Sequence, residues 1–451
     1  MAAVSRLAAV GRGDRPGGLT SAVVTDLHEL SALECAAAVR RREVSPIELV
    51  SYSFGRIEAL DPKLGAFVTL TPESALRQAR AAESLVMSTD DPDALPPLLG
   101  VPTAVKDLNQ VAGVPSHFGS QTMPDFVPPF DDHVVRLLRD AGTISLGKTA
   151  TPEFGLCCYT ETEIGPPART PWDVTRSAGG SSGGAGAAVA SGMLPFAQGS
   201  DGGGSIRIPS SVCGLVGLKT SRGRVSRGPV DLDVTRLSVL GPLARTVRDA
   251  AAFLDAVAGP QLGDPDPLPA LPAGESYLDW CEREPGRLRI GRFIDAPMSD
   301  GVDPDVFAAW EQASLLLSSL GHEVVDVPPP MPPESVAAFE TVWAVSAGTI
   351  PVEASREHLL TPLAKYLRAR AREVSGIEFA NAMAQLKTMS RDAIIGTARF
   401  DAVLVPTLAR LPQPIGYFSA GGDAAEDFER QKRFTPYTAI YNVTGQPAIS
   451  L

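Results

Sequence analysis

The sequence predicts an α/β domain built on a mixed, twisted central β-sheet with α-helices on both faces. Short apolar runs of strand length alternate along the chain with segments whose apolar residues recur at helical spacing. Residues 287–327 read as strand, helix and strand, which is a unit of α/β folds. At 451 residues, 44% of them hydrophobic, the chain can bury a large core, and large α/β enzymes of this length can form one domain.

The first helices are predicted from their start signals. Residues 1–25 mix Gly, Arg and small residues without periodicity, and we expect them to form a mobile tail. Ser31 and Ser45 are each followed three residues later by glutamate, which is the pattern of a capping box, and Pro46 suits the first helical position. A third helix is expected after Thr71.

Strands and helices alternate through the rest of the chain. An apolar strand is predicted over 98–105, directly before Lys106. A helix ending at Gly142 follows, and then a short strand over 143–147. Later elements are predicted in this order: a helix over 246–258, a linker over 264–275, the strand–helix–strand unit, helices over 334–398 and a buried strand over 402–408.

Composition excludes several classes of partner. The formal net charge is −12 and the chain has no basic block, so nucleic acid and anionic membranes are not expected as partners. Arg6 and Arg12 interrupt the apolar N-terminus, and nowhere is an apolar run long enough to cross a bilayer. The five cysteines are an odd number without CxxC pairs, which suits a reduced compartment. The sequence therefore predicts a cytoplasmic enzyme.

The stretch 177–220 organises the chain. Ten glycines lie between Gly179 and Gly204, in two serine-containing clusters around an apolar segment. A flexible Gly/Ser linker would carry few apolar residues. Glycine is used where the backbone takes positive φ or comes close to another group, so these clusters indicate a backbone shaped for a site.

Two short patterns suggest other functions and fail on context. Residues 142–149 match the phosphate-binding loop G-x-x-x-x-G-K-[ST], but a helix precedes them and the supposed loop is itself strand-like. Residues 180–184 match the G-x-S-x-G nucleophile elbow, which requires an apolar strand directly before it and a downstream histidine as base. The only downstream histidines, His322 and His358, lie in plain helix or strand contexts.

Lys106, GGSSGG at 179–184 and GSDGGGSIRIP at 199–209 together resemble the amidase signature family. The resemblance extends over nearly the whole chain and implies the amidase-signature fold. It implies one domain over 26–451, with a catalytic core at about 95–260 and a more variable, substrate-facing part at about 276–400. It implies no metal and no organic cofactor, and the oligomeric state, including a homodimer, stays open.

The resemblance implies a role for each matching residue. Ser205 corresponds to the acylated nucleophile, Ser181 to a bridging serine held by a cis peptide and close to the substrate, and Lys106 to the terminal base. Gly155 corresponds to a position that lines the acyl pocket. The backbone amides of the loop would form the oxyanion hole, namely those of Gly202, Gly203, Gly204 and Ser205.

Physical chemistry supports this assignment independently. A serine hydroxyl is a weak nucleophile and needs a base, and a lysine is a base only when it is neutral. Burial after an apolar strand would lower the pKa of Lys106. Side-chain-free amides can converge on a developing oxyanion. The polar residues Ser182, Asp201 and Arg207 are expected to support the loop through hydrogen bonds and an ion pair, and an ordinary polar loop is the alternative for each.

The C-terminus departs from the family pattern. The sequence ends at Leu451 inside an expected strand, where the family continues into another strand and a last helix. If those residues are absent, an edge of the sheet is exposed.

These observations predict an amidase that hydrolyses a small, aryl or oligomeric carboxylic amide to a carboxylate and ammonia or an amine. The alternatives are the A subunit of a tRNA-dependent amidotransferase and a catalytically silent amide-binding homologue. The substrate is not predicted, because pocket walls select it. Phe339 and Trp343 are equally assigned to the core and to the pocket.

Overall fold

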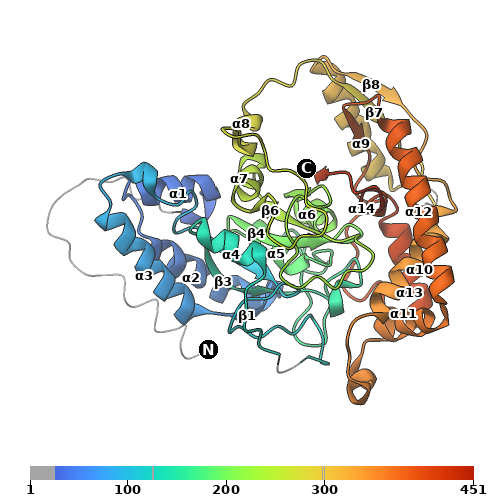
Figure 1. Ribbon diagram of the computed structural model, residues 1–451, viewed down its shortest axis with the longest axis horizontal. Coiled ribbons are helices and arrows are strands. Elements are labelled where there is room, and N and C mark those ends of the chain that lie inside the picture. The colour runs from blue at the N-terminus through green and yellow to red at the C-terminus, as the bar shows by residue number, and fades with distance from the viewer. Residues whose placement is uncertain (1–25, 124–125, 297, 299) are drawn as a thin grey trace.

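The computed structural model describes residues 26–123, 126–296, 298 and 300–451. The tail predicted over 1–25 lies outside the described residues. Figure 1 shows α1–α3 at one end of the molecule, the sheets of the site in the middle, and α10–α13 along the opposite side. The expected α/β class, with mixed sheets flanked by helices, is confirmed.

The N-terminal helices begin where the capping signals predict. The Ser31 and Ser45 side chains each accept a hydrogen bond from a backbone amide of the first turn, and the glutamate of each capping box bonds back to the serine N–H. The three helices are α1 (Ala32–Arg40), α2 (Pro46–Leu64) and α3 (Pro72–Ser88). Figure 1 shows them grouped beside β1 and β3.

Hydrogen bonding divides the strands into three sheets. The first has the order β1-β3-β2 and is mixed, because β1 is antiparallel and β2 parallel to β3. The second has the order β10-β5-β6-β4 and is antiparallel. Their strands are β1 (Phe67–Leu70), β2 (Pro102–Lys106), β3 (Ile144–Thr149), β4 (Phe196–Asp201), β5 (Val216–Lys219), β6 (Val239–Ala244) and β10 (Ala448–Ser450).

Side chains join the first two sheets where β2 lies beside β4. Thr103 Oγ1 donates to the Phe196 carbonyl at 3.3 Å, and the Lys106 amide donates to Gln198 Oε1 at 3.0 Å. β2 begins four residues later than predicted, because the chain turns at Gly100, whose φ is +82°. The consequence for the site is that Lys106 is the last residue of a buried strand.

The predicted strand–helix–strand unit forms the third sheet, which is parallel and has the order β8-β7-β9. The strand predicted to be buried over 402–408 is wrong in burial and length. It is an edge strand of three residues whose first residue is exposed. The elements are β7 (Arg289–Arg292), α9 (Pro304–Ser319), β8 (Glu323–Asp326) and β9 (Ala402–Leu404).

The remaining helices cover the sheets and build the far side of the molecule. The helix α5 is buried on all sides because its small residues pack between the two sheets of the site and its neighbouring helices. These elements are α4 (His133–Asp140), α5 (Gly183–Ala190), α6 (Arg207–Cys213), α7 (Val247–Val257), α8 (Tyr277–Cys281), α10 (Ser335–Gly348), α11 (Pro362–Glu373), α12 (Gly376–Thr397), α13 (Ala424–Phe434) and α14 (Ala439–Thr444), with short 3₁₀ helices η1 (Leu27–Glu29), η2 (Pro92–Ala94), η3 (Glu153–Gly155) and η4 (Ala354–Leu359).

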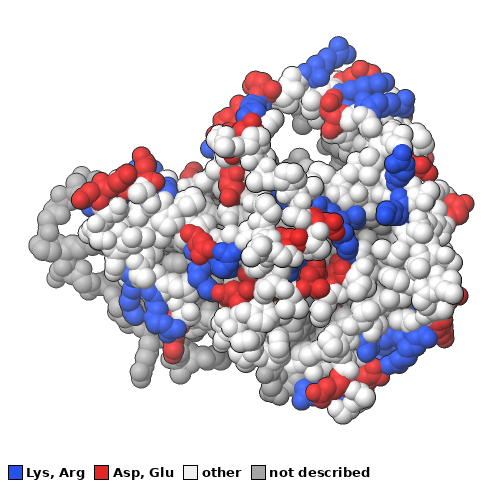
Figure 2. All heavy atoms as spheres, in the orientation of Figure 1, with Lys and Arg blue, Asp and Glu red and all other residues white. Residues whose placement is uncertain are grey.

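One large hydrophobic core joins α1–α3 to the first two sheets, and its aromatic centre is an edge-to-face pair of Phe196 and Phe253 with centroids 6.0 Å apart. Smaller clusters hold α10–α13 together. Figure 2 shows acidic and basic side chains interspersed on the visible face. Within the described ranges, no helix combines the length and the apolar character needed to cross a membrane.

Candidate active site

The ε-amino group of Lys106 is buried at the carboxyl end of β2. Its Nζ donates to Ser181 Oγ at 2.8 Å and to Ser200 Oγ at 3.1 Å. Burial lowers the pKa of Lys106 to about 7, and the negative charge of Asp201 opposes that shift. A substantial fraction of this amine is therefore neutral near pH 7, as a general base requires.

The first glycine cluster brings Ser181 to Lys106 by close backbone packing. The peptide bond between Gly180 and Ser181 is cis, as the resemblance implied. A Cβ on Gly180 would lie 2.7 Å from the backbone of Tyr159, and one on Gly184 would lie 2.4 Å from the Ala150 amide. Larger residues would therefore push this segment away from the strand that carries Lys106.

Ser205 stands between the second glycine cluster and α6. Its carbonyl accepts a hydrogen bond from the Ser182 amide at 3.1 Å, which ties the two glycine clusters together. The residue is 7% exposed and lines a cavity, together with Gly203. The structure thus places Ser205 in the wall of the cavity, while Lys106 and Ser181 are buried in the core.

The predicted oxyanion hole needs one correction. The Gly204 amide donates to Asp201 Oδ1 at 2.7 Å, so this N–H is already committed and is not free for a substrate oxygen. Among the described residues, none accepts a hydrogen bond from the amides of Gly202, Gly203 or Ser205. These three amides remain the candidates for the oxyanion hole.

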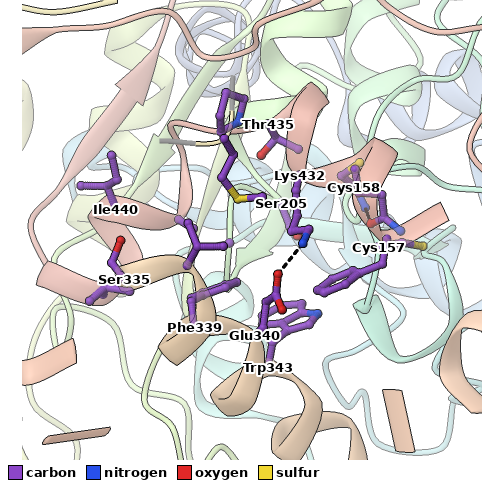
Figure 3. Close-up of a pocket in the computed structure, with 18 of the residues that line it drawn as sticks. Cys157, Cys158, Ser205, Ser335, Phe339, Glu340, Trp343, Lys432, Thr435 and Ile440 are labelled. Carbon is purple, nitrogen blue, oxygen red and sulfur yellow. Dashed lines mark hydrogen bonds and ion pairs between the residues drawn. The ribbon is translucent and has the colours of Figure 1, made fainter. Parts of the chain in front are cut away.

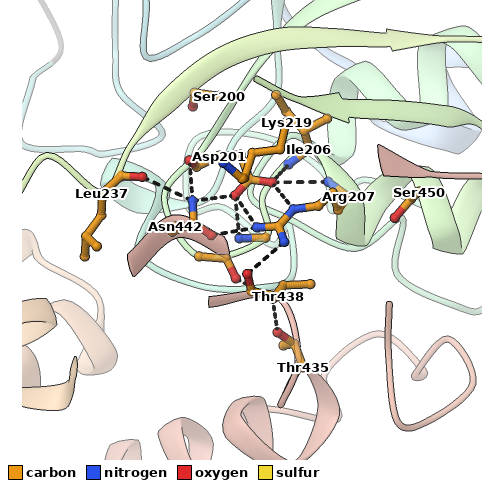
Figure 4. Close-up of polar contacts among 12 residues, drawn as sticks. Ser200, Asp201, Ile206, Arg207, Lys219, Leu237, Thr435, Thr438, Asn442 and Ser450 are labelled. Carbon is orange, nitrogen blue, oxygen red and sulfur yellow. Dashed lines mark hydrogen bonds and ion pairs between the residues drawn. The ribbon is translucent and has the colours of Figure 1, made fainter. Parts of the chain in front are cut away.

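A buried ion pair holds the glycine loop in shape (Figure 4). Asp201 and Arg207 pair at 2.9 Å, and the carboxylate also accepts from the Ile206 amide at 3.2 Å. Burial favours the neutral acid, but the adjacent guanidinium holds the pKa of Asp201 well below its usual range. The expected supporting ion pair therefore lies directly beneath the loop.

The helix α14 completes this network, and the sequence did not indicate it. Arg207 donates to the Thr438 carbonyl at 2.7 Å and to Asn442 Oδ1 at 2.6 Å, while Asn442 Nδ2 donates to the Asp201 carbonyl at 2.8 Å. Thr438 Oγ1 also donates to the Gly203 carbonyl at 2.5 Å. Thr438 directly precedes α14 and Asn442 lies four residues later in that helix, and this spacing was the available signal.

Ser200 was also missed. It alternates with Gln198 along β4, so both polar side chains face β2, where one contacts Nζ and the other the backbone of Lys106. This period-2 pair in a buried strand could have indicated it. Ser182, which was expected to support the loop, donates through Oγ to the Ser200 carbonyl at 3.2 Å.

The cavity in front of Ser205 is mainly apolar (Figure 3). Phe339 and Trp343 of α10 line it as a stacked pair with centroids 5.6 Å apart, so both belong to the pocket and to the packing around it. Gly155 of η3 lines it too, and a Cβ there would lie 3.1 Å from Ser181 Oγ. The expectation that Gly155 borders the site agrees with this position.

Other reactive groups near the site have structural roles. Burial raises the pKa of the Cys157 thiol well above its usual value, so this cavity-lining sulfur stays protonated. Lys148, the lysine of the phosphate-loop pattern, is buried in β3 and pairs with Asp107 at 2.9 Å. In the part of the chain that the structure describes, no three His, Cys, Asp or Glu side chains are grouped to hold a metal ion.

Comparison with known proteins gives consistent matches over most of the chain. A family model described as Amidase matches residues 48–451. A putative amidase of Synechocystis sp. is 36% identical over 401 residues, covering 87% of this chain and 76% of that protein. The A subunit of the glutamyl-tRNA(Gln) amidotransferase of Carboxydothermus hydrogenoformans is 38% identical over 325 residues, covering 72% of this chain and 66% of that protein.

Solved structures agree. The structure of a 6-aminohexanoate cyclic dimer hydrolase complexed with substrate superposes with a TM-score of 0.84 at 32% identity, covering 94% of this chain and 90% of that one. The family match spans both glycine clusters and Lys106, and the superposed structure covers most of the chain. The chain therefore belongs to the amidase family, that of the amidase signature enzymes.

Proposed function

We propose that the chain hydrolyses carboxylic amides through an acyl-enzyme on Ser205. The observation that carries this proposal is the 2.8 Å contact between Lys106 Nζ and Ser181 Oγ, made by a buried lysine whose pKa is about 7. Such a pair can accept a proton without histidine. Ser205, the proposed nucleophile, lines a mainly apolar cavity that can hold a substrate.

The reaction proceeds in two halves. Ser205 Oγ attacks the amide carbon while its proton passes to Ser181, whose own proton passes to Lys106. The amides of Gly202, Gly203 and Ser205 donate to the oxygen that becomes negative, which lowers the barrier where charge develops. The proton returns along the same relay to the leaving nitrogen, so the C–N bond breaks and ammonia or an amine departs.

Water completes the cycle. It attacks the Ser205 ester, gives a proton to the same relay, and releases the carboxylate as Ser205 Oγ recovers its proton. The cavity in front of Ser205, of about 140 Å³, is lined mainly by apolar and aromatic side chains. We therefore infer an aryl or short alkyl group next to the scissile carbonyl, in a linear or a cyclic amide.

Product release from a panel of aryl and alkyl amides tests this function. We expect amine release by the chain alone, and a hydroxamate product when hydroxylamine competes with water for the acyl-enzyme. Ser205→Ala should abolish both products. A folded wild-type chain that binds amides but gives neither product would instead be the catalytically silent homologue.

The A subunit of an amidotransferase is the second candidate, because several relatives carry that name at 37–40% identity. This role predicts that glutamine is the substrate and that a second protein co-purifies with the chain. Glutamine hydrolysis that depends on such a partner, with no turnover of simple amides, would favour it over the hydrolase.

A further inference from the structure

An ion pair faces the otherwise apolar cavity. Glu340 of α10 and Lys432 of α13 form a salt bridge, and they are the charged side chains among the described residues that line the cavity. Their side chains are only 16% and 14% exposed. Each has a further partner outside the cavity, since Arg370 lies 3.5 Å from Glu340 and Glu429 contacts Lys432. The pair thus places two partly buried charged groups, each able to hydrogen-bond to a ligand, in the wall of the cavity.

The pair lies next to the wall that faces the reacting centre. Glu340 directly follows Phe339, whose ring stacks on Trp343. A Cβ built on Gly202 would lie 3.5 Å from Trp343, and one on Gly203 would lie 3.8 Å from Phe339. A substrate that extends from Ser205 along these rings therefore reaches the Glu340–Lys432 pair (Figure 3).

We propose that this pair binds a second, neutral amide group of the substrate, which makes the substrate a diamide or oligoamide. Lys432 donates to the distal carbonyl oxygen, and Glu340 accepts from the distal N–H. This inference rests on the proposed hydrolysis at Ser205 and deepens it by naming the substrate class.

Charge balance favours a neutral group. The four side chains Arg370, Glu340, Lys432 and Glu429 carry two positive and two negative charges, and each contacts an opposite charge. A substrate carboxylate or ammonium would compete with one of these partners and leave another charge unpaired. An amide presents an acceptor and a donor side by side, so it can bond to both members of the pair without separating them.

The test compares three substrates that share one scissile amide. One carries a distal amide, the second replaces the distal N–H by an ester oxygen, and the third replaces the distal amide by methylenes. We expect the wild type to hydrolyse the diamide with a kcat/KM about 10- to 100-fold above the methylene analogue, as for hydrogen bonds to charged groups, with the ester in between. This wild-type comparison does not depend on any variant folding.

Variants of Glu340 and Lys432 test whether the substrate preference depends on this ion pair. In Glu340→Gln the preference of diamide over ester should fall toward one, and in Lys432→Met the preference over the methylene analogue should fall by about tenfold or more. Glu426→Gln, on the same helix as Lys432 but paired with Arg430 and not lining the cavity, is the matched control and should keep the wild-type preferences.

Several results would overturn the proposal. These are a wild type that treats the three substrates alike, a wild type that prefers the methylene analogue, and variants that keep the wild-type preference. In all of these the scissile amide is still hydrolysed, so the proposed function survives. If none of the substrates is hydrolysed, both proposals fail together.

Discussion

At the scale of single residues, the proposed mechanism depends on a lysine that ionises near neutrality. Burial lowers the pKa of Lys106 to about 7, so the amine is protonated below that pH and neutral above it. Because only the neutral form accepts the Ser181 proton, kcat/KM should rise with pH through about 7 and then level off. Rates measured between about pH 5 and pH 9 check this. A profile that falls over this range would contradict it.

The two serine hydroxyls that contact Lys106 Nζ should contribute differently to catalysis. In the proposed mechanism Ser181 relays the proton to Lys106, which it contacts at 2.8 Å, so Ser181→Ala should lower kcat by about 10²- to 10⁴-fold. Ser200 Oγ only accepts a hydrogen bond from the amine, at 3.1 Å, and Ser200→Ala should lower kcat by about 10-fold or less. Steady-state rates with one amide compare them. Equal losses in the two variants would mean that Ser181 has no special role.

Much of the residue-level site was predictable because each of its reactive residues lies in a short sequence motif. Lys106 and Ser181, 75 residues apart, meet as predicted from their motifs. The Gly204 amide was assigned to the oxyanion hole, but it donates to Asp201 instead. Sequence identifies a loop of free amides, whereas the direction of each N–H depends on the peptide planes, which tertiary contacts set.

At the scale of elements, the close packing around α5 leaves no room for a side chain at Gly184. A Cβ at Gly184 would meet the Ala150 amide at 2.4 Å and the Ala66 carbonyl at 2.5 Å, and both are backbone atoms of packed segments. Gly184→Ala should therefore lower the free energy of unfolding by about 1–3 kcal/mol, measured by urea denaturation. The control is Gly396→Ala in α12, where the added Cβ meets open space. It should change little or stabilise by up to about 1 kcal/mol.

The ion pair that joins β4 and α6 to α14 should matter as much to stability as to catalysis. Asp201→Asn leaves the Arg207 guanidinium buried without a counter-charge, so we expect unfolding to be easier by about 3–5 kcal/mol. Asp140→Asn removes a charge from the exposed Arg136–Asp140 pair, and its urea transition should stay close to that of the wild type. Similar transitions for both variants would show that the buried pair is not a structural link.

Elements with local signals were predicted well, and those defined by distant partners were not. Each capping box, at Ser31 and at Ser45, spans only four residues at the start of its helix, so it can be read from the local sequence. Strand pairing brings together segments far apart, so the division into three sheets was not readable from apolar runs. The strand over 402–404 pairs with only one neighbour and lies at the edge of its sheet. Its first residue is exposed and the other two are partly buried.

At the scale of the whole molecule, two distant parts of the chain enclose the cavity. Trp343 Nε1 of α10 donates to the Leu156 carbonyl beside η3 at 3.3 Å, while its ring faces the loop at Gly202. Trp343→Ala should lower kcat/KM by about 10- to 100-fold, mainly through a higher KM, because the lost aromatic surface binds substrate. Initial rates over a range of amide concentration would show this. An unchanged KM would show that Trp343 of α10 does not contribute to substrate binding.

The part of the cavity wall formed by α10 could not be predicted from the sequence. The motifs around Lys106 and Ser205 can be read from short segments, but the ring of Trp343 reaches the glycine loop only through the packing of α10–α13. No period or spacing in residues 334–398 distinguishes a pocket residue from a core residue. For the same reason, no sequence pattern marks Glu340 and Lys432 as partly buried charges that line a cavity.

The central claim is that Ser205 is a nucleophile activated by Ser181 and Lys106, and covalent labelling tests it most directly. Intact-mass spectrometry after treatment with a serine-directed fluorophosphonate should show one adduct on the wild type and none on Ser205→Ala. Labelling should be slower in Ser181→Ala and Lys106→Ala. An adduct that persists in Ser205→Ala, or a folded wild type that takes no label, would contradict the proposed mechanism.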